Sequence, residues 1–265
     1  MNTTGKRPTL SIVIPVYNEQ ESIGEVLRAI EANVNTPHEV LVVYDFEEDS
    51  TVPVVTALQP EFPAVRLHRN DIGRGVLYAI RSGMDHALGD FVLVSMADGS
   101  DDARDIDAMV ALGIDGAAVV AASRYAPGGA QVGGPKLKAR ASRTAGMLLH
   151  VLGGFPIHDP TNNFKLYDRS FLESITIEST RGFELGLELT VKAHGAGLGI
   201  KEVPTTWRDR TIGESHFHVL RLLPGYLRWF ALGLSYRLPR RVQRVLSSRL
   251  TRDHAFGDEP RAPRH

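Results

Sequence analysis

Two clusters of acidic side chains follow strand-like runs of the chain. The first spans residues 45–49 and the second residues 98–102. Carboxylates and hydroxyls at this density suit a hard cation such as Mg²⁺ or Mn²⁺, which commonly bridges a carboxylate to a diphosphate. Both clusters also fit solvated turns, with Asp101 or Asp102 capping the next helix. The clusters therefore predict either a cation and polar-ligand site or two ordinary turns.

The elements that must position these clusters alternate along the first half of the chain. Strands are predicted at residues 10–16, 39–44, 64–68, 91–96 and 117–122, and helices at 21–32, 52–58 and 75–87. This alternation predicts an α/β fold, with a mostly parallel twisted sheet and helices on both faces. Ligands of such sheets bind beyond the carboxyl ends of the strands, so both acidic clusters should lie at one edge.

The second half of the chain lacks the regular alternation of strands and helices. The glycine- and proline-rich residues 123–135 predict a mobile loop over the edge of the sheet. A basic helix is predicted at 136–151, a further helix at 183–194 and a strand at 200–206. The polar residues 252–265 are expected to be a disordered tail.

Composition excludes several classes of protein. The chain has 265 residues, of which 43% are hydrophobic and 23% charged, so it can bury a substantial core. It has no cysteine, which excludes disulfides, thiolate metal sites and cysteine nucleophiles and fits a reducing compartment. No apolar run approaches the roughly 20 residues of a membrane-spanning helix, so we expect a soluble or peripheral protein.

The last quarter of the chain is basic. Seven arginines and no acidic residue lie between Phe217 and Thr251, with aromatic and leucine side chains among them. This pattern predicts amphipathic helices over 216–251 that lie in lipid headgroups, with the arginines outward and the aromatics inward. Pro224 and Pro239 are expected to divide the arm into shorter helices. A dimer or partner-protein interface fits the same pattern.

A series of short motifs runs in one order from Leu10 to Ser215. They are Ile14-Pro15-Val16-Tyr17-Asn18-Glu19, Asp45, the segment from His68 to Gly75, Gly89-Asp90-Phe91, the segment from Ser123 to Gly129, Ser142-Arg143, Asp159-Pro160-Thr161, Gly182-Phe183 with Glu188, and Val203-Pro204 through Arg210 to Gly213-Glu214-Ser215. Their succession resembles the inverting family 2 glycosyltransferases of the GT-A type, and within them the polyprenyl-phosphate (dolichol-phosphate) mannose synthases. The similarity would make residues 1–215 the catalytic domain.

The resemblance implies a reaction and its residues. It implies inverting transfer of a sugar, mannose from GDP-mannose, to the phosphate of a polyprenyl phosphate. It places the donor nucleotide at Pro15, Tyr17, Asn18, Glu19, Asp45, Asp71, Arg74 and Ala97. It places Mg²⁺ or Mn²⁺ at Asp98 and Ser100, and the acceptor phosphate at Arg124, Lys138, Ser142 and Arg210. Asp98, Arg124 and Arg210 are the implied catalytic residues.

The chemistry of this reaction needs no strong general base. A phosphate monoester has its second pKa near 6 and is mostly dianionic at pH 7. The site must therefore supply positioning and charge compensation, which means a cation for the leaving diphosphate and arginines for the acceptor phosphate. A guanidinium fork suits a phosphate in two contacts. Surface salt bridges are the ordinary alternative for these cations.

Two positions depart from the family pattern. Asp45 is followed by Phe46-Glu47 where Gly-Ser is usual, which leaves the base and sugar open. The Asp-X-Asp metal motif reads Met96-Ala97-Asp98, and a thioether is a poor ligand for a hard cation. Asp98 would then hold the metal with Ser100, Asp102 or water, or metal dependence would be weaker. Met96 itself is expected to pack at a strand end.

The partners follow from the reaction. We expect a nucleotide diphosphate sugar, a polyprenyl phosphate and the cytoplasmic face of a membrane, with a homo-oligomer or a membrane partner subunit as the alternative for the arm. A soluble or polysaccharide acceptor and a non-catalytic nucleotide-sugar binder are the rival functions. No nucleic acid is expected, because only the basic arm would favour it. The histidines His68, His86, His150 and His194 are predicted as packed or surface residues.

Overall fold

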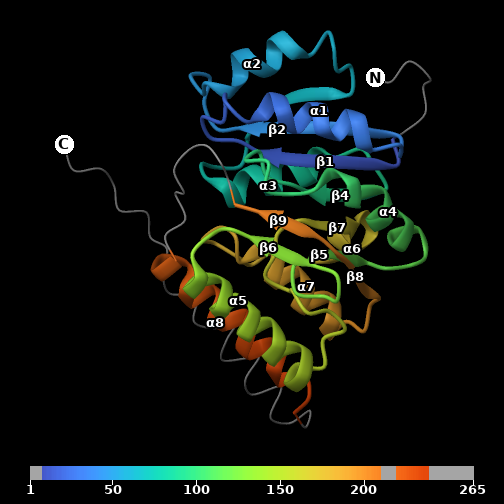
Figure 1. The fold of residues 1–265 in the computed structure, drawn as a ribbon, viewed down its shortest axis with the longest axis vertical. Helices are drawn as coiled ribbons and strands as arrows, with labels where there is room; N and C mark the ends of the chain where they lie inside the picture. The colour runs from blue at the N-terminus through green and yellow to red at the C-terminus, as the bar shows by residue number, and fades with distance from the viewer. Residues whose placement is uncertain (1–7, 210–218, 239–265) are drawn as a thin grey trace, which may run out of the picture.

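The computed structural model describes residues 8–209 and 219–238, and its core is one seven-stranded sheet (Figure 1). The strand order is β3-β2-β1-β4-β7-β5-β8. The strands are β1 (Leu10–Pro15), β2 (His38–Tyr44), β3 (Val65–Arg69), β4 (Phe91–Val94), β5 (Val119–Ser123), β7 (Lys165–Asp168) and β8 (Ile200–Pro204). All run parallel except β7, which lies antiparallel between β4 and β5. The predicted mostly parallel α/β sheet is confirmed.

Helices cover both faces of the sheet, as predicted. One face packs against α1 (Ile23–Asn33), α2 (Thr51–Leu58) and α4 (Ile106–Ile114), which follows the 3₁₀ turn η1 (Ala103–Asp105). The other face packs against α3 (Val76–His86), α6 (Arg169–Ser174) and α7 (Leu185–Gly195). Every residue of β1 is buried, because alternate side chains meet the two helix layers. Burial on both faces explains why this strand is a continuous apolar run.

A further helical layer lies outside α7. It consists of α5 (Lys136–Leu148), a single π-helical turn η2 (Leu149–Gly153) and α8 (Val219–Ser235), which Figure 1 shows at the end of the molecule opposite α2. Trp229 is only 1% exposed and packs with Leu149, Phe155 and Leu187. The expectation that the aromatics of the arm point into lipid is therefore wrong for Trp229. Its indole fills the space over α7 instead.

The arm also differs from prediction in its continuity and its charges. The helix α8 runs through Pro224, where a break was expected, and Trp229 packs this helix against the domain. Arg228 pairs with Glu178 and lies 4.6 Å from the centroid of the Trp229 ring, so this arginine faces protein. Pro239 and the predicted tail at 252–265 lie outside the described residues. Of the predicted helical region 216–251, the structure describes residues 219–238. Within residues 8–209 and 219–238, no helix is both long and apolar enough to span a bilayer.

Two pairings in the second half were not predicted. The strand β7 has just four residues, with polar side chains at both ends, and carries no alternation signal. The predicted loop at 123–135 contains β6 (Ala130–Val132), which pairs with β9 (Thr206–Arg208) in a separate two-stranded sheet. The predicted strand at 200–206 is therefore divided at Thr205 between two sheets.

The helix α3 approaches the sheet closely at Gly83. A Cβ atom at this position would overlap the side chain of Val13 and lie 3.0 Å from Cγ2 of Val43. We expect Gly83→Ala to lower the free energy of unfolding by about 1 to 3 kcal/mol, because the strands cannot move aside without disturbing both layers. Urea unfolding followed by circular dichroism measures this.

The matched control is Gly24→Ala in α1. There the new methyl group would meet its nearest atom, Nη1 of Arg28, at 3.4 Å. With space available, the change should stabilise the protein by about 0.5 to 1 kcal/mol, since alanine loses less conformational entropy in a helix. Equal effects of the two substitutions would contradict the close approach of α3.

Candidate active site

Residues after five parallel strands meet at one edge of the sheet. Tyr17 follows β1, Asp45 follows β2, Asp71 follows β3, Asp98 follows β4 and Arg124 follows β5. Because these strands point the same way, their carboxyl ends share an edge. The structure thus brings the predicted donor, metal and acceptor segments to the place where such sheets bind ligands.

The turn after β1 is held against the start of α2. Asn18 has a φ of 55°, the only positive value of a non-glycine residue in the described chain. Its N–H donates to Oδ1 of buried Asp49 at 3.1 Å, and the N–H of Glu19 donates to Oγ1 of Thr51 at 2.8 Å. Tyr17 is 55% exposed, and its ring meets Phe46 edge-on at 5.7 Å between centroids. Phe46 therefore places a second aromatic side chain beside Tyr17 at this turn.

Asp45, in the loop after β2, forms hydrogen bonds with the loop between β3 and α3. One carboxylate oxygen accepts from Nδ2 of Asn70 at 2.7 Å, and the other accepts from the N–H of Gly75 at 2.7 Å. Gly75 has a φ of 108°, a conformation that favours glycine, so the loop between β3 and α3 turns sharply beside Arg74. Asp45, Asp71 and Arg74 consequently belong to one connected region. Asn70, which was not among the predicted site residues, is the link.

Two of the predicted donor-binding residues, Pro15 and Ala97, are buried. Pro15 is buried at the end of β1, and Ala97 is 3% exposed between the sheet and α4.

The three aspartates of residues 98–102 have different surroundings. Asp101 turns inward, where it accepts from the N–H of Met96 at 2.9 Å and from Oγ of Ser95 at 3.1 Å. Burial raises the pKa of Asp101 to about 7. Asp102 accepts from Nε of Arg104 at 2.8 Å and caps η1 through the N–H of the same arginine, as the ordinary turn alternative predicted.

Asp98 and Ser100 flank the exposed Gly99; Asp98 is half-buried and Ser100 is buried. The N–H of Ser100 donates to Oδ1 of Asp98 at 3.1 Å across Gly99, which has a φ of 72°. Met96 packs against the core, in line with its predicted role. Asp98 is the half-buried carboxylate of the three. One carboxylate is enough for a Mg²⁺-type ion that also binds substrate phosphates.

The Arg124 guanidinium is held by a buried carboxylate. Nε donates to Oδ2 of Asp159 at 2.6 Å, and Nη2 donates to Oδ1 of Asp159 at 2.9 Å. The Arg124 side chain is 13% exposed and that of Asp159 is 0% exposed. The attraction of Arg124 keeps the pKa of Asp159 lowered, against the opposing effect of burial. Asp159 was not in the predicted site, although its motif was recognised.

Ser142 joins this cluster from α5. Nη2 of Arg124 donates to Oγ of Ser142 at 3.2 Å, and the Ser142 hydroxyl lies 2.7 Å from Oγ1 of Thr161. Lys138 lies one helical turn before Ser142, but its side chain is outside the described part of the structure. Arg124 and Ser142 are therefore brought together as predicted, while Lys138 is placed only by its backbone.

Arg210 lies outside the described residues. The chain leading to it contacts residues 98–102, because the N–H of Arg208 in β9 donates to the carbonyl oxygen of Ser100 at 3.3 Å. Arg124 and Asp101 also influence each other's pKa, so the Arg124 cluster and residues 98–102 share one electrostatic environment. The roles of Arg210 and Lys138 stay predictions.

Lys165 is a fully buried cation beneath the Arg124 cluster. Its Nζ donates to the carbonyl oxygens of Pro160 and Asn162. Burial lowers the pKa of Lys165 to about 7, although Asp159 opposes the shift. The amine stabilises the turn that carries Asp159 and Thr161, and these two residues contact Arg124.

This pKa predicts a pH-dependent stability. Between pH 7 and about pH 10 the unfolded chain keeps the proton on Lys165 and the folded chain does not, so stability rises with pH. The free energy of unfolding of the wild type should rise relative to Lys165→Met by up to about 1.4 kcal/mol per pH unit in this window. Urea unfolding from pH 6 to pH 10 measures the difference, with Lys201→Met, at an exposed position of β8, as control. Parallel profiles for wild type and Lys165→Met would contradict the prediction.

The sequence of this edge matches a known family. Residues 11–176 match the model of "Glycosyl transferase family 2", which covers β1 to β7 and the segments carrying Asp45, Asp98 and Arg124. The chain belongs to this family. The family 2 assignment confirms the resemblance in the sequence and makes the protein a glycosyltransferase.

Two curated relatives of this family 2 glycosyltransferase are 30% identical to it. One is the polyprenol monophosphomannose synthase of Mycolicibacterium smegmatis, aligned over 244 residues, or 88% of this chain and 91% of the relative. The other is the undecaprenyl-phosphate mannosyltransferase of Micrococcus luteus, aligned over 210 residues, or 77% of this chain and 85% of the relative.

Solved structures share the fold at lower identity. The glucosyl-3-phosphoglycerate synthase of Mycobacterium tuberculosis, solved with Mn²⁺, UDP and glucosyl-3-phosphoglycerate, has a TM-score of 0.63 and 16% identity. The match covers 87% of this chain and 80% of that one. A second mycobacterial protein has a TM-score of 0.66 and 17% identity, over 86% and 75% of the two chains. These likenesses confirm the GT-A-type fold of the family 2 domain.

Proposed function

We propose that this glycosyltransferase transfers mannose from GDP-mannose, with inversion, to the phosphate of a polyprenyl phosphate. The observation that carries the proposal is the exposed, mixed apolar and basic surface of α5 and η2, which adjoins Ser142 and Arg124. Such a surface fits an amphiphilic acceptor, whose phosphate would reach the cluster while its isoprenoid chain lies along the helix. The mannosyltransferase names of the two curated relatives support the choice of sugar and acceptor.

The helix α5 has little contact with the rest of the domain. Among its residues with described side chains, only Gly146 is buried, where it packs on the carbonyl oxygen of His158. Apolar side chains are exposed along α5 and η2, namely Leu137 at 82%, Met147 at 54%, Val151 at 62% and Leu152 at 55%. A groove of about 300 Å³ beside them is lined by Arg140, Arg143, Thr144, Met147 and Leu148.

The charge of α5 suits a phosphorylated lipid at a bilayer. The helix carries Lys136, Lys138, Arg140 and Arg143 and no acidic residue. Basic side chains with interleaved apolar ones favour anionic headgroups and the upper acyl region. We therefore place the enzyme at the cytoplasmic face of a membrane, bound peripherally through this surface. Contact with a second copy or a membrane subunit is the other arrangement that such a surface allows.

The reaction itself needs two sites that face each other. The donor would lie along Tyr17, Asn18, Glu19, Asp45, Asp71 and Arg74, with its diphosphate directed to Asp98. The acceptor phosphate would bind to Arg124, Ser142, Lys138 and Arg210. A phosphate oxygen attacks the anomeric carbon as the bond to the nucleotide diphosphate breaks, and the leaving group departs as the nucleoside diphosphate. The residues act by positioning and charge compensation.

Asp98 and Ser100 would hold a Mg²⁺ or Mn²⁺ ion. The fit rests on the hard oxygen donors of the Asp98 carboxylate and the Ser100 hydroxyl, since the Met96 side chain packs against the core. When bound, such an ion supplies positive charge to the leaving diphosphate. The Mn²⁺ bound in the structurally similar synthase supports this choice of cation.

The test is a sugar-transfer assay into organic-extractable lipid. Purified protein is supplied with labelled GDP-mannose, GDP-glucose, UDP-glucose or UDP-galactose, a polyprenyl phosphate, and Mg²⁺ or Mn²⁺. We expect lipid-linked label from GDP-mannose and its absence when dephosphorylated polyprenol replaces the phosphate. Transfer to 3-phosphoglycerate or another soluble acceptor would overturn the lipid proposal. Nucleotide binding without any turnover would indicate a binding protein instead.

A double substitution on α5 and η2 tests whether this surface contacts the lipid chain of the acceptor. Met147→Glu together with Val151→Glu places two negative charges on exposed positions without disturbing the core. We expect reduced binding to anionic vesicles and slower transfer to long-chain polyprenyl phosphate, with unchanged transfer to a short, soluble isoprenyl phosphate. Equal loss with both acceptors would show that α5 does not contact the lipid chain.

A further inference from the structure

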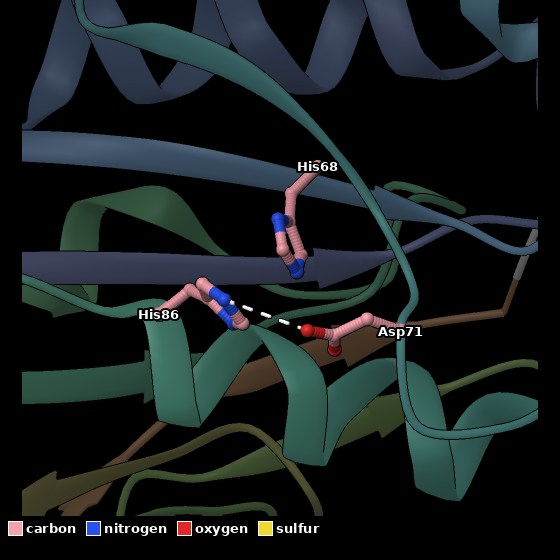
Figure 2. A group of neighbouring side chains, drawn as sticks. All are labelled: His68, Asp71 and His86. Atoms are coloured by element: carbon pink, nitrogen blue, oxygen red, sulfur yellow. Dashed lines mark ion pairs between the residues drawn. The ribbon is translucent and has the colours of Figure 1, made fainter.

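Two histidines and an aspartate converge beside the loop that joins β3 to α3 (Figure 2). His68 lies in β3, Asp71 lies in the loop and His86 is the last residue of α3. One possible ligand atom from each residue lies within 4.8 Å of the other two. Figure 2 shows the three side chains pointing toward a common space from these separate elements.

The tautomer of His86 is fixed by a backbone bond. Its Nδ1 lies 3.0 Å from the carbonyl oxygen of Ser82, and a carbonyl only accepts, so Nδ1 carries the hydrogen. This leaves the lone pair of a neutral ring on Nε2, which lies 3.6 Å from Oδ2 of Asp71. That separation is long for a hydrogen bond but close to the roughly 3.3 Å between two ligands of a tetrahedral ion with bonds near 2.0 Å.

Ser82 orients Asp71 and also contacts His68. This buried hydroxyl donates its single proton to Oδ1 of Asp71 at 2.7 Å, so Nε2 of His68, which lies 2.7 Å from the same oxygen, is the donor in the metal-free protein. An ion at Nε2 of His68 would replace this bond, with the ring hydrogen moved to Nδ1. Partners of this kind, a carbonyl for one imidazole and a hydroxyl for a carboxylate, are the usual outer contacts of metal ligands.

We propose that His68, Asp71 and His86 form a binding site for one divalent transition-metal ion such as Zn²⁺. Two imidazole nitrogens and one carboxylate suit zinc and its first-row neighbours and do not suit Mg²⁺, which prefers oxygen ligands. The site therefore differs in chemistry from the Asp98 and Ser100 position. His86 and Asp71 are about half exposed, so an ion can enter, and water can complete the coordination.

A bound ion would connect three elements around the donor loop. It would join β3, residues 70–75 and the end of α3. The other end of that loop is held to Asp45 through the N–H of Gly75. The ion would thus stiffen the segment that carries Asp71 and Arg74. The proposal concerns metal binding alone and stands whether or not the enzyme transfers mannose to a lipid.

The test uses the full chain without a histidine tag, stripped of metal by a chelator. Zn²⁺ is titrated in competition with a chromophoric chelator, and Co²⁺ binding is followed by its visible absorption. We expect one tight Zn²⁺ per chain that excess Mg²⁺ does not displace. His86→Gln should weaken this binding by more than about 100-fold, since altered outer contacts alone cost 10- to 100-fold.

His150→Gln is the matched control, because His150 belongs to another pair of close rings, stacked on His158 at 4.2 Å between centroids. It should leave the tight site intact. Asp71→Asn supplies a second variant of near-identical shape, and circular dichroism verifies folding of each. The absence of a tight site in the wild type, or equal affinity in wild type and His86→Gln, would overturn the proposal. Loss of the site in His150→Gln alone would also overturn it.

Discussion

Replacing Arg124 with methionine is expected to lower the free energy of unfolding by about 3 to 5 kcal/mol. The reason is that Asp159, whose side chain is fully buried, would lose the guanidinium that donates to both of its carboxylate oxygens. An uncompensated carboxylate in the interior costs much more than a missing surface charge. Urea unfolding at pH 7.5 measures the loss.

The control for this prediction is Arg69→Met. Arg69 pairs with Glu47 at 3.5 Å, and both side chains are more than half exposed, so its removal should change stability by no more than about 1 kcal/mol. Adding Asp159→Asn to Arg124→Met should recover part of the stability, because it removes the buried charge. If Arg124→Met lowers the free energy of unfolding by less than about 1 kcal/mol, Arg124 and Asp159 do not stabilise each other.

The same pair bears on catalysis. The guanidinium fork of Arg124 already binds a carboxylate, so an acceptor phosphate would approach the side that faces Ser142. Arg124→Lys keeps a positive charge but cannot make both contacts with Asp159. We expect it to raise KM for the phosphate acceptor more than KM for the nucleotide sugar.

Asp98→Asn is expected to lower kcat/KM for sugar transfer by about 10²- to 10³-fold. An amide is a weaker ligand for a hard cation than a carboxylate, so the leaving diphosphate would lose charge compensation. Stability should change little, because Asp98 is half-buried and an asparagine amide oxygen can still accept from the N–H of Ser100. Initial-rate kinetics at saturating Mn²⁺ measure the effect, and Mn²⁺ binding by electron paramagnetic resonance gives a readout independent of turnover.

Asp102→Asn is the matched control for Asp98. Its carboxylate pairs with Arg104 and caps η1, and asparagine also caps well, so we expect less than about a fivefold change in kcat/KM. A large loss from Asp102→Asn with a small loss from Asp98→Asn would transfer the metal role to Asp102. Equal, small losses would show that the reaction does not depend on either carboxylate.

Some local features were predictable because the signal lies within a few neighbouring residues. The apolar run of β1 and the helical spacing of Ile23, Val26, Leu27 and Ile30 in α1 predict their elements directly. Pairing between distant short segments has no such signal. The three-residue strands β6 and β9 pair across more than seventy positions, and β7 inserts antiparallel where a parallel neighbour would be the simplest expectation.

The fold class and the family were predictable from the sequence, because periodicity and motif order are local properties of the chain. Which groups contact one another depends on the folded backbone. Arg124 meets Asp159, 35 positions away, and His68 meets His86, 18 positions away. Trp229 likewise packs on α7 and η2 rather than in lipid. An apolar or charged side chain specifies what kind of partner it needs, and the folded backbone determines which partner is within reach.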